Sequence, residues 1–496
     1  MAHLTQTLRG VKGGLWEVCI GLEVHAQIHL NTKLFSRSAA DCRDRRDPPN
    51  SRVSFFDAAF PGTLPVTNAA AVEQVVRTGL ALGCTIHQRS IFERKHYFYS
   101  DLPHGYQITQ NRHPIASGGK LTLLDPATVI DKAGRHTSAA WTDKSEVVGG
   151  EAGEAGEAIP SVAVNRIQLE MDSGKSLHKY TGDQSFVDLN RAGAALMEIV
   201  LDPDIRSAAG AGEAVRSLQF LLRRLGTCDG NMEDGSMRCD LNVSVRAVGC
   251  GDMGERVEVK NMNSVRSLVA AAEAEAKRQV ALLEEGQMGG VERETRGFNV
   301  DKNCTFRLRG KEGLVDYRFL PEPDLPPLVI PRSCVELLKQ TLPELPGAAL
   351  QRLQSEYGLP ERYSRVLVCA SGGAVAYFEA AVSAAPPSPV GARRRSGGRD
   401  PQMVANWVCN NLFGLLKGTL EDSAREDELE RALPSSKLGD LLDLLGDGTI
   451  SNQTMKAMLR IMVEVGVSVG SVVLMLGLGF GFGLGAAEDQ MQINGG

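Results

Sequence analysis

Four segments of the chain alternate apolar and polar residues with a period of two, and this pattern restricts the fold more than any other feature. The longest is LWEVCIGLEVHAQIHL, residues 15–30, in which every even position is apolar and the odd positions include Glu23 and His25. Because successive side chains of a strand point to opposite faces, such a segment predicts a strand with one buried and one polar face. The same alternation occurs in residues 166–172, 237–246 and 256–260.

Helices are predicted between these strands. Asn68, Ser207 and Ser264 each stand before a run of apolar residues at helical spacing, where their side-chain oxygens can cap the first turn. Glycines that can end these helices follow at Gly83, Gly226 and Gly286. The sequence before Pro331 is therefore predicted to be α+β, whereas only helical signals follow it.

The organisation of the chain predicts four regions. Residues 1–15 contain Arg9, Lys12 and no acid, as in the remnant of an organellar transit peptide. Residues 16–330 form the sheet-containing core, and residues 331–465 form a helical domain with a Pro-, Gly- and Arg-rich linker near 385–401. Residues 466–496 form a low-complexity terminus.

One segment is long enough to cross a bilayer. Residues 465–487 are 23 uncharged residues, but seven of them are glycine, which is a poor residue for a membrane helix. We therefore expect no membrane anchor.

Charge and cysteine usage exclude some classes of function. The formal charge of −6 does not suit a general polyanion binder, so any nucleic-acid surface must be a local patch. The ten cysteines show no C-x-x-C spacing, which disfavours a zinc site of that type and a redox motif.

Polar residues on the predicted strands suggest a site. Glu23 and His25 share one strand face, Glu170 and Asp172 share another, and Glu198, Asp240 and Lys260 lie on later segments. If these strands are neighbours, carboxylates, an imidazole and lysines converge, which suits Mg²⁺ and nucleotide phosphates. A solvated sheet with exposed ion pairs is the alternative, and spacing alone favours it.

Other nucleotide-binding signals are weak. Gly174-Lys175-Ser176 imitates the end of a P-loop, but Leu169 replaces the first glycine that the phosphate cradle needs. The aromatic run Tyr97-Phe98-Tyr99 can stack on a nucleobase or belong to the core, and the core is the favoured interpretation.

Eight longer motifs follow one another along the chain: IGLEVHAQ, RKHYFYSDLPHGYQITQ, LEMDSGK, DLNRAG with MEIVLDPDI, GNMEDGSMRCDLNVSVR, VEVKNMNSVRS, ETRGF and DYRFLPEPDLPPL. In content and in order they resemble the B subunits of the tRNA-dependent amidotransferases that act on glutamyl-tRNA(Gln) and aspartyl-tRNA(Asn). The resemblance extends from about Glu17 to Leu328, and more weakly to ANWVCNNL and ISNQTMKAMLRIM.

The resemblance implies a fold and an activity. The core would be an antiparallel sheet with helices, related to glutamine synthetase and the guanidino kinases. It would use ATP to phosphorylate the side-chain carboxylate of glutamate mischarged on tRNA(Gln). Ammonia from glutamine hydrolysis in an A subunit would then displace the phosphate, and a small C subunit would hold the assembly together.

The resemblance also implies site residues. The family's metal-binding motifs fall on Glu23, His25, Glu170 and Glu198, which we expect to hold Mg²⁺ and orient the phosphates. Lys175, Asp188, Asn190 and Lys260 are expected beside the phosphates or metal-bound water.

Three departures from the family pattern matter. Bacterial relatives carry paired cysteines after the TKLF segment, whereas this chain has only Cys42 there, so no zinc is expected and the organellar type of the family is indicated. Met171 stands where relatives often have a second acid. The family's helical tail that engages tRNA is replaced by the low-complexity terminus, which predicts either weaker tRNA binding or an incorrect gene model at this end. A mitochondrial location is expected, with the plastid as the alternative.

Two other functional classes are alternatives to an amidotransferase subunit. A free-standing small-molecule kinase or ligase on the same sheet would need no RNA and would leave the helical part without a purpose. A non-catalytic scaffold for tRNA or partner subunits would not need all four expected metal ligands.

Overall fold

The computed structural model describes residues 7–40, 47–124, 161–177, 185–286, 290–310, 317–370, 373–383, 398–416 and 427–465. These residues form two compact units: those up to Gly347 belong to the first, and those from Ala348 onward belong to the second. The linker predicted near 385–401, the terminus at 466–496 and Cys42 lie largely or wholly outside the described residues.

One large sheet of eleven described strands is the frame of the first unit. Its order is β16-β15-β14-β13-β2-β12-β9-β7-β3, with β1 paired to β2 and β8 paired to β9. The strands are β1 (Thr7–Arg9), β2 (Leu15–Gln27), β3 (Thr85–Ile86), β7 (Ala116–Ser117), β8 (Lys120–Thr122), β9 (Ser161–Met171), β12 (Ala195–Ile205), β13 (Met237–Ala247), β14 (Val257–Met262), β15 (Glu294–Asn299) and β16 (Cys304–Gly310).

The sheet is mostly antiparallel, as predicted, with one departure. Strands β14 and β15 pair in parallel. A parallel pair needs a crossover connection, and helix α3 (Val265–Glu284) lies between these two strands in the chain and can supply it. All four alternating segments predicted from the sequence are strands of this sheet, namely β2, β9, β13 and β14.

The three helices predicted from their capping residues are confirmed. They are α1 (Ala69–Ala81), α2 (Ala208–Arg224) and α3. The side chains of Asn68, Ser207 and Ser264 accept hydrogen bonds from backbone N–H groups of the first turns. The glycines that follow the three helices all have positive φ angles, which explains why the helices end there: Gly83, Gly226 and Gly286.

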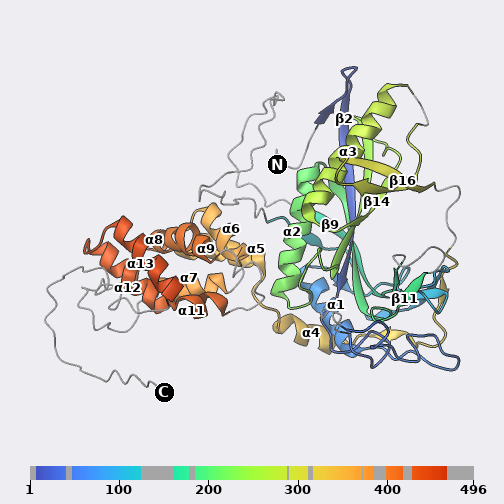
Figure 1. Cartoon of the computed structure of the whole chain (residues 1–496), viewed down its shortest axis with the longest axis horizontal. Coiled ribbons are helices and arrows are strands. Elements are labelled where there is room, and N and C mark those ends of the chain that lie inside the picture. The colour runs from blue at the N-terminus through green and yellow to red at the C-terminus, as the bar shows by residue number, and fades with distance from the viewer. Residues whose placement is uncertain are drawn as a thin grey trace. The chain divides into compact units, whose positions relative to one another are not determined.

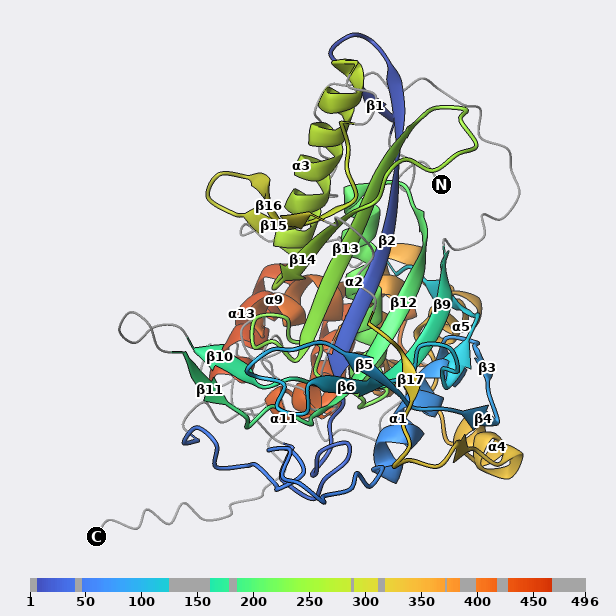
Figure 2. The same cartoon turned by 90° about the vertical axis from the view of Figure 1, so that its right-hand side faces the viewer.

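These helices pack on the apolar face of the sheet (Figure 1). Leu22 and Val24 of β2 are fully buried in this core, together with Leu241 of β13 and Leu218 of α2. Figure 2 looks onto the sheet, where β13, β2, β12 and β9 run side by side and β5 and β6 cross in front of their lower ends. The polar face is therefore partly covered by a second layer.

Short strands make up that second layer and the surrounding small sheets. Strand β5 (Glu93–His96) pairs with β6 (Tyr106–Thr109) and with β17 (Leu320–Pro321), and Arg94 fixes β17 through two 2.7 Å bonds to Glu322. The other small sheets pair β10 (Lys175–Leu177) with β11 (Phe186–Asp188) and β4 (Arg89–Ser90) with β18 (Leu328–Val329).

The sequence predicts a separate helical domain after residue 330, but the first unit extends further. Helix α4 (Arg332–Gln340) packs on α1 within this unit, and the side chain of Arg77 donates to Thr341 at its end. Because its neighbour is α1, helix α4 belongs with the sheet.

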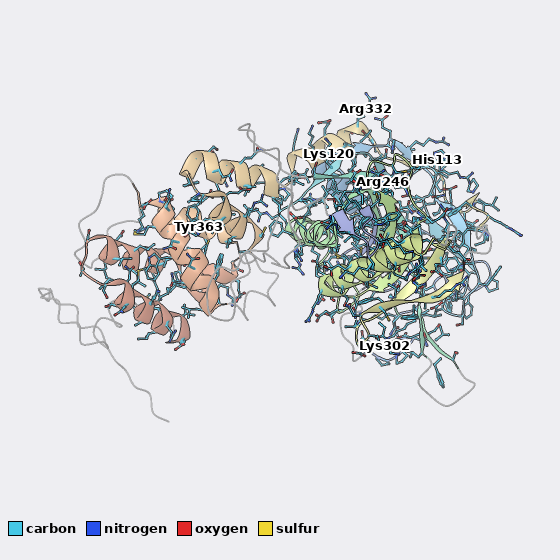
Figure 3. The ribbon with its side chains drawn as sticks, turned by 90° about the horizontal axis from the view of Figure 1, so that it is seen from above. His113, Lys120, Arg246, Lys302, Arg332 and Tyr363 are labelled. Atoms are coloured by element: carbon cyan, nitrogen blue, oxygen red, sulfur yellow. The ribbon has the colours of Figure 1, made fainter. Side chains whose placement is uncertain are left out.

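The described part of the second unit is helical. The ring of the buried Phe378 contacts that of Tyr357, and Arg399 holds Asp443 through two 2.8 Å bonds. Tyr363, labelled in Figure 3, donates to Asn406. The helices are α5 (Pro346–Tyr357), which begins at the boundary, α6 (Glu361–Cys369), α7 (Ala374–Val382), α8 (Pro401–Trp407), the π-helical turn η1 (Val408–Leu412), α9 (Phe413–Leu415), α11 (Glu428–Ala432), α12 (Ser435–Gly446) and α13 (Asn452–Val465).

Among the residues that the structure describes, no helix is long and apolar enough to cross a membrane. The uncharged segment at 465–487 lies almost entirely outside those residues.

A buried ion pair joins three loops of the first unit. Lys33 and Asp57 are almost fully buried, and the Lys33 Nζ atom lies 3.1 Å from Asp57 Oδ2 and 3.3 Å from the carbonyl oxygen of Leu189. Asp57 also accepts hydrogen bonds from Ser36 and from the backbone of Ser54. The pair therefore connects the loop after β2, the loop before α1 and the loop after β11.

Replacing Lys33 with Met should destabilise the first unit by about 3 kcal/mol, because the Asp57 carboxylate would stay buried without its cation. The measurement is the urea midpoint of the unfolding transition. The matched control is Lys302→Met, at the exposed rim of this unit (Figure 3), which should change nothing. A Lys33→Met midpoint equal to that of the control would contradict the assigned role of the ion pair.

Candidate active site

Strand register brings the polar side chains of four strands into one patch. His25 of β2 is paired with Arg238 of β13 on one side and with Glu198 of β12 on the other. Glu198 is in turn paired with Gln168 of β9, and Glu170 follows two residues later on the same face. Residues 25, 170, 198 and 238 are far apart in the chain, and the antiparallel pairing places them side by side.

His25, Glu170 and Glu198 form the centre of this patch, which we call the central cluster. Their ligand-type atoms all lie within 4.8 Å of one another. His25 Nε2 is 3.3 Å from Glu170 Oε1 and 3.9 Å from Glu198 Oε2. Both carboxylates are buried, with 3% of Glu170 and 7% of Glu198 exposed. The alternative of a solvated sheet with exposed ion pairs therefore does not describe this patch.

The electrostatics of the cluster follow from this crowding. Burial raises the pKa of Glu198, the charge of Glu170 raises it further, and His25 partly opposes both. Burial alone would lower the pKa of His25, but Glu170 and Glu198 outweigh it and raise the pKa. The side-chain amide of Gln168 donates to Glu198 over 2.8 Å, which helps to hold this carboxylate in place.

A divalent cation fits the donors of the central cluster. Two buried carboxylates with one imidazole offer two oxygens and one nitrogen that converge on a small volume. A cation there would relieve the repulsion that raises the pKa of Glu198. In the described part of the chain, no lysine or arginine forms an ion pair with Glu170 or Glu198, so His25 is the one basic side chain there that pairs with these two carboxylates.

Glu23 lies on the same face but belongs to a second group. Its Oε1 atom accepts a 3.2 Å hydrogen bond from Asn242, and its partner in the register of β13 is Asp240. Burial, followed by the charge of Glu198, raises the pKa of Glu23. Glu23 is not one of the three residues whose ligand atoms converge in the central cluster.

Lys260 balances the charge of this second group. Its Nζ atom is 3.1 Å from Asp240 Oδ2 and 3.1 Å from Glu258 Oε1. Burial alone would lower the pKa of Lys260, but the two carboxylates outweigh it and raise the pKa. The structure thus places Lys260 within the polar face and between two acids.

Lys175, Asp188 and Asn190 lie in or beside the β10–β11 ribbon, which is a separate sheet. Lys175 is the register partner of Asp188. Asp188 accepts from the backbone N–H of Asn50, and Asn190 accepts from that of Arg52. These contacts hold the loop at residues 47–52, and none of them reaches the central cluster.

Several contacts of the patch were not expected from the sequence. Gln168 binds Glu198, and Asp172, which the sequence had already placed beside Glu170 on one strand face, forms an ion pair with Arg238 across the polar face. The charge of Lys95 on β5 partly opposes the rise in the pKa of Glu198. Strand alternation could have indicated Gln168, but the others depend on contacts between distant strands that spacing does not reveal.

The aromatic run beside the cluster is only partly buried. The Tyr97 hydroxyl donates a hydrogen bond to Gln107. Burial, together with the charge of Glu170, raises the pKa of Tyr97. Phe98 is 86% exposed and Tyr99 is 60% exposed, so the favoured interpretation of this run as core is wrong for both. The Lys95 ammonium lies 5.0 Å from the ring centre of Tyr317 and 5.9 Å from that of Tyr97.

The sequence of this chain matches known families along most of its length. Residues 18–336 match the GatB/GatE catalytic domain, which therefore includes all four strands of the patch. The chain belongs to the GatB family. Residues 394–480 match a further family described as the GatB domain.

Relatives of this GatB chain occur in a eukaryote and in bacteria. The mitochondrial B subunit of the glutamyl-tRNA(Gln) amidotransferase of Phytophthora infestans is 48% identical, over 92% of this chain and 82% of the relative. The B subunits of the aspartyl/glutamyl-tRNA(Asn/Gln) amidotransferases of Rhodospirillum rubrum and Rickettsia bellii are 43% and 41% identical, each over 93% of this chain and 84% of the relative.

Replacing Glu198 with Gln should raise the melting temperature of the metal-free GatB chain at pH 8, but not at pH 4.5. The pKa of Glu198 is raised in the folded state, so ionisation of this carboxyl group destabilises the fold. The destabilisation is complete at a pH above the folded-state pKa and absent at a pH below the unfolded-state pKa. Glutamine removes this charge and keeps an oxygen for Gln168. A gain of about 2–4 °C is expected at pH 8, measured by calorimetry in EDTA.

The control for this measurement is Glu73→Gln, on the exposed surface of α1, which should leave the melting temperature unchanged at both pH values. A gain for Glu198→Gln of the same size at pH 4.5 and pH 8 would show that charge burial is not the cause.

Proposed function

We propose that this chain is the ATP-using subunit of a glutamyl-tRNA(Gln) amidotransferase. The observation that carries the proposal is the central cluster, His25 with the buried Glu170 and Glu198, inside the region that matches the GatB/GatE catalytic domain. The names of the relatives support glutamyl-tRNA(Gln) as the substrate. Its products would be glutaminyl-tRNA(Gln), ADP and phosphate.

The proposed reaction has two steps. An oxygen of the tRNA-bound glutamate side chain attacks the γ-phosphorus of ATP, a new O–P bond forms, and the bond to the β–γ bridging oxygen breaks with its electron pair leaving on ADP. Ammonia then attacks the carbonyl carbon of the acyl phosphate. The C–O bond to phosphate breaks, phosphate leaves, and the nitrogen loses a proton to give the amide.

Residues of this chain serve the first step by position and charge, which is what phosphoryl transfer requires of a protein. His25, Glu170 and Glu198 would hold a divalent cation, which we propose to be Mg²⁺, with Glu23 beside it; the ion would neutralise charge on the phosphates. Gln168 orients Glu198. Lys175, Asp188, Asn190 and Lys260 stay proposed neighbours, with Lys260 acting through Asp240 and Glu258.

The same reasoning extends to partners, location and fold relation. We propose that a glutamine-hydrolysing A subunit supplies ammonia, that a C subunit completes the assembly, and that no zinc is needed. The mitochondrial relative and the basic first residues support residence in the mitochondrion. A mostly antiparallel sheet with helices on one face and carboxylates on the other supports a relation to glutamine synthetase and the guanidino kinases.

Glu198→Gln in the complex with A and C subunits should lower ATP cleavage stimulated by Glu-tRNA(Gln) at least about 100-fold, because the proposed cation would lose one of its two carboxylate ligands and neutralise less charge on the phosphates. Phosphate release and glutaminyl-tRNA formation are measured together. Glu73→Gln serves as the control and should keep full activity. A scaffold role would instead leave both rates of Glu198→Gln unchanged, as would an active centre elsewhere in the complex.

A further inference from the structure

Arg238 is the basic side chain closest to the central cluster in the strand register. It lies opposite His25 in the pairing of β13 with β2, and its charge lowers the pKa of His25. The charges of Asp172, Glu170 and Asp240 all raise its own pKa, so it faces acids on both sides. The guanidinium is therefore permanently charged at the polar face.

The Arg238 side chain reaches across the face to the end of β9. Its Nη2 atom lies 3.0 Å from Asp172 Oδ1, although two strands, β2 and β12, separate β13 from β9 in the sheet. The Arg238 side chain thus extends from beside His25 to Asp172. About a third of the side chain is exposed, so it is open to a ligand on this face.

Asp172 is itself fixed from several directions. It is 4% exposed, and its Oδ2 atom lies 3.3 Å from Arg191 Nε. Its backbone N–H donates to Ala194, and its carbonyl accepts from Gly193, whose φ of +84° forms the turn that allows this. The carboxylate that holds Arg238 is therefore rigidly placed.

The two arginines beside Asp172 differ in the use of their donors. Arg191 gives hydrogen bonds to the carbonyl oxygens of Ser173 and Gly174, so its guanidinium is occupied by backbone. For Arg238, the bond to Asp172 is the only one within the described residues. A guanidinium has five N–H donors, so most of those of Arg238 remain for an anion.

We propose that Arg238, oriented by Asp172, binds the γ-phosphoryl group of the nucleotide during transfer. This rests on the proposed function and adds a residue to it. The N–H donors of a guanidinium form a planar fork that matches phosphate oxygens. Because Asp172 already orders the Arg238 side chain, little side-chain entropy is lost when the anion binds. Arg238 contacts the phosphoryl group, and Asp172 acts through Arg238 as a positioning residue.

The test compares two nucleotides in the complex with A and C subunits and Mg²⁺. AMP-PNP carries a γ-phosphoryl group and ADP does not. Arg238→Gln should weaken AMP-PNP binding at least about tenfold and leave ADP binding within twofold. It should also lower the kcat of Glu-tRNA(Gln)-stimulated phosphate release about 100-fold, with an unchanged KM for the tRNA.

Conservative variants separate position from charge. Arg238→Lys should bind AMP-PNP more tightly than Arg238→Gln and less tightly than the wild type, because lysine keeps the positive charge but lacks the paired N–H donors of the guanidinium. Asp172→Asn should lower kcat about tenfold with Arg238 intact, and Asp172→Glu should recover part of that loss. The control is Arg246→Gln, on the same face of β13 (Arg246 is labelled in Figure 3), paired with Glu17 and roughly 26 Å along the strand.

Three outcomes would overturn the proposal. One is that Arg238→Gln binds both AMP-PNP and ADP as tightly as the wild type does. Another is an equal loss of both affinities, which a structural defect would give. The third is a raised KM for Glu-tRNA(Gln) at unchanged kcat, which would assign Arg238 to the substrate carboxylate. Absence of tRNA-stimulated ATP cleavage in the wild-type complex would instead contradict the proposed function, and the nucleotide affinities would still test Arg238.

Discussion

Strand β2 supplies the core and the site at once, and the rest of the first unit depends on this double use. Its alternate side chains point to opposite faces, so Leu22 and Val24 lie under the helices while Glu23 and His25 lie on the polar face. A shift of one residue in its register would exchange the two sets. The apolar face therefore fixes the register, and the register fixes which acids meet His25.

Two acidic groups share this face, and their charges are balanced in different ways. Asp240 and Glu258 hold the Lys260 ammonium between them, so a built-in cation neutralises that group. Glu170 and Glu198 have only His25 as an ion-pair partner in the described part of the chain. This contrast supports the proposal of a cation at the central cluster, whereas the fixed lysine makes the second group less suited to one.

The sequence was sufficient for the parts of the fold that local chemistry decides. Alternation located β2, β9, β13 and β14, and the capping residues Asn68, Ser207 and Ser264 located the starts of three helices. The parallel pair β14–β15 and the place of α4 could not be predicted this way. Both depend on how surfaces far apart in the chain pack together.

In the candidate site too, the sequence indicated some residues, whereas the roles of others depend on contacts between distant segments. Glu23, His25, Glu170 and Glu198 stand in motifs that the resemblance made visible. Arg238 also stands in a family motif, GNMEDGSMRCDLNVSVR, but neither the motif nor strand alternation indicated its role, which depends on its contact with Asp172 across two other strands. Asp188 and Asn190 also stand in a family motif, yet they accept hydrogen bonds from the loop at residues 47–52.

The layer over the polar face links the architecture to the chemistry. Thr109 and Gln107 of β6 contact the β9 segment that carries Glu170, and Gln110 accepts from the backbone of Leu169. This layer is what buries the two carboxylates, and burial strengthens every charge interaction among them. An acyl phosphate is readily hydrolysed, so a covered site also favours attack by ammonia over attack by water. Burial of Glu170 and Glu198 therefore makes the cluster electrostatically unfavourable in isolation, and the same covered site suits an acyl phosphate intermediate.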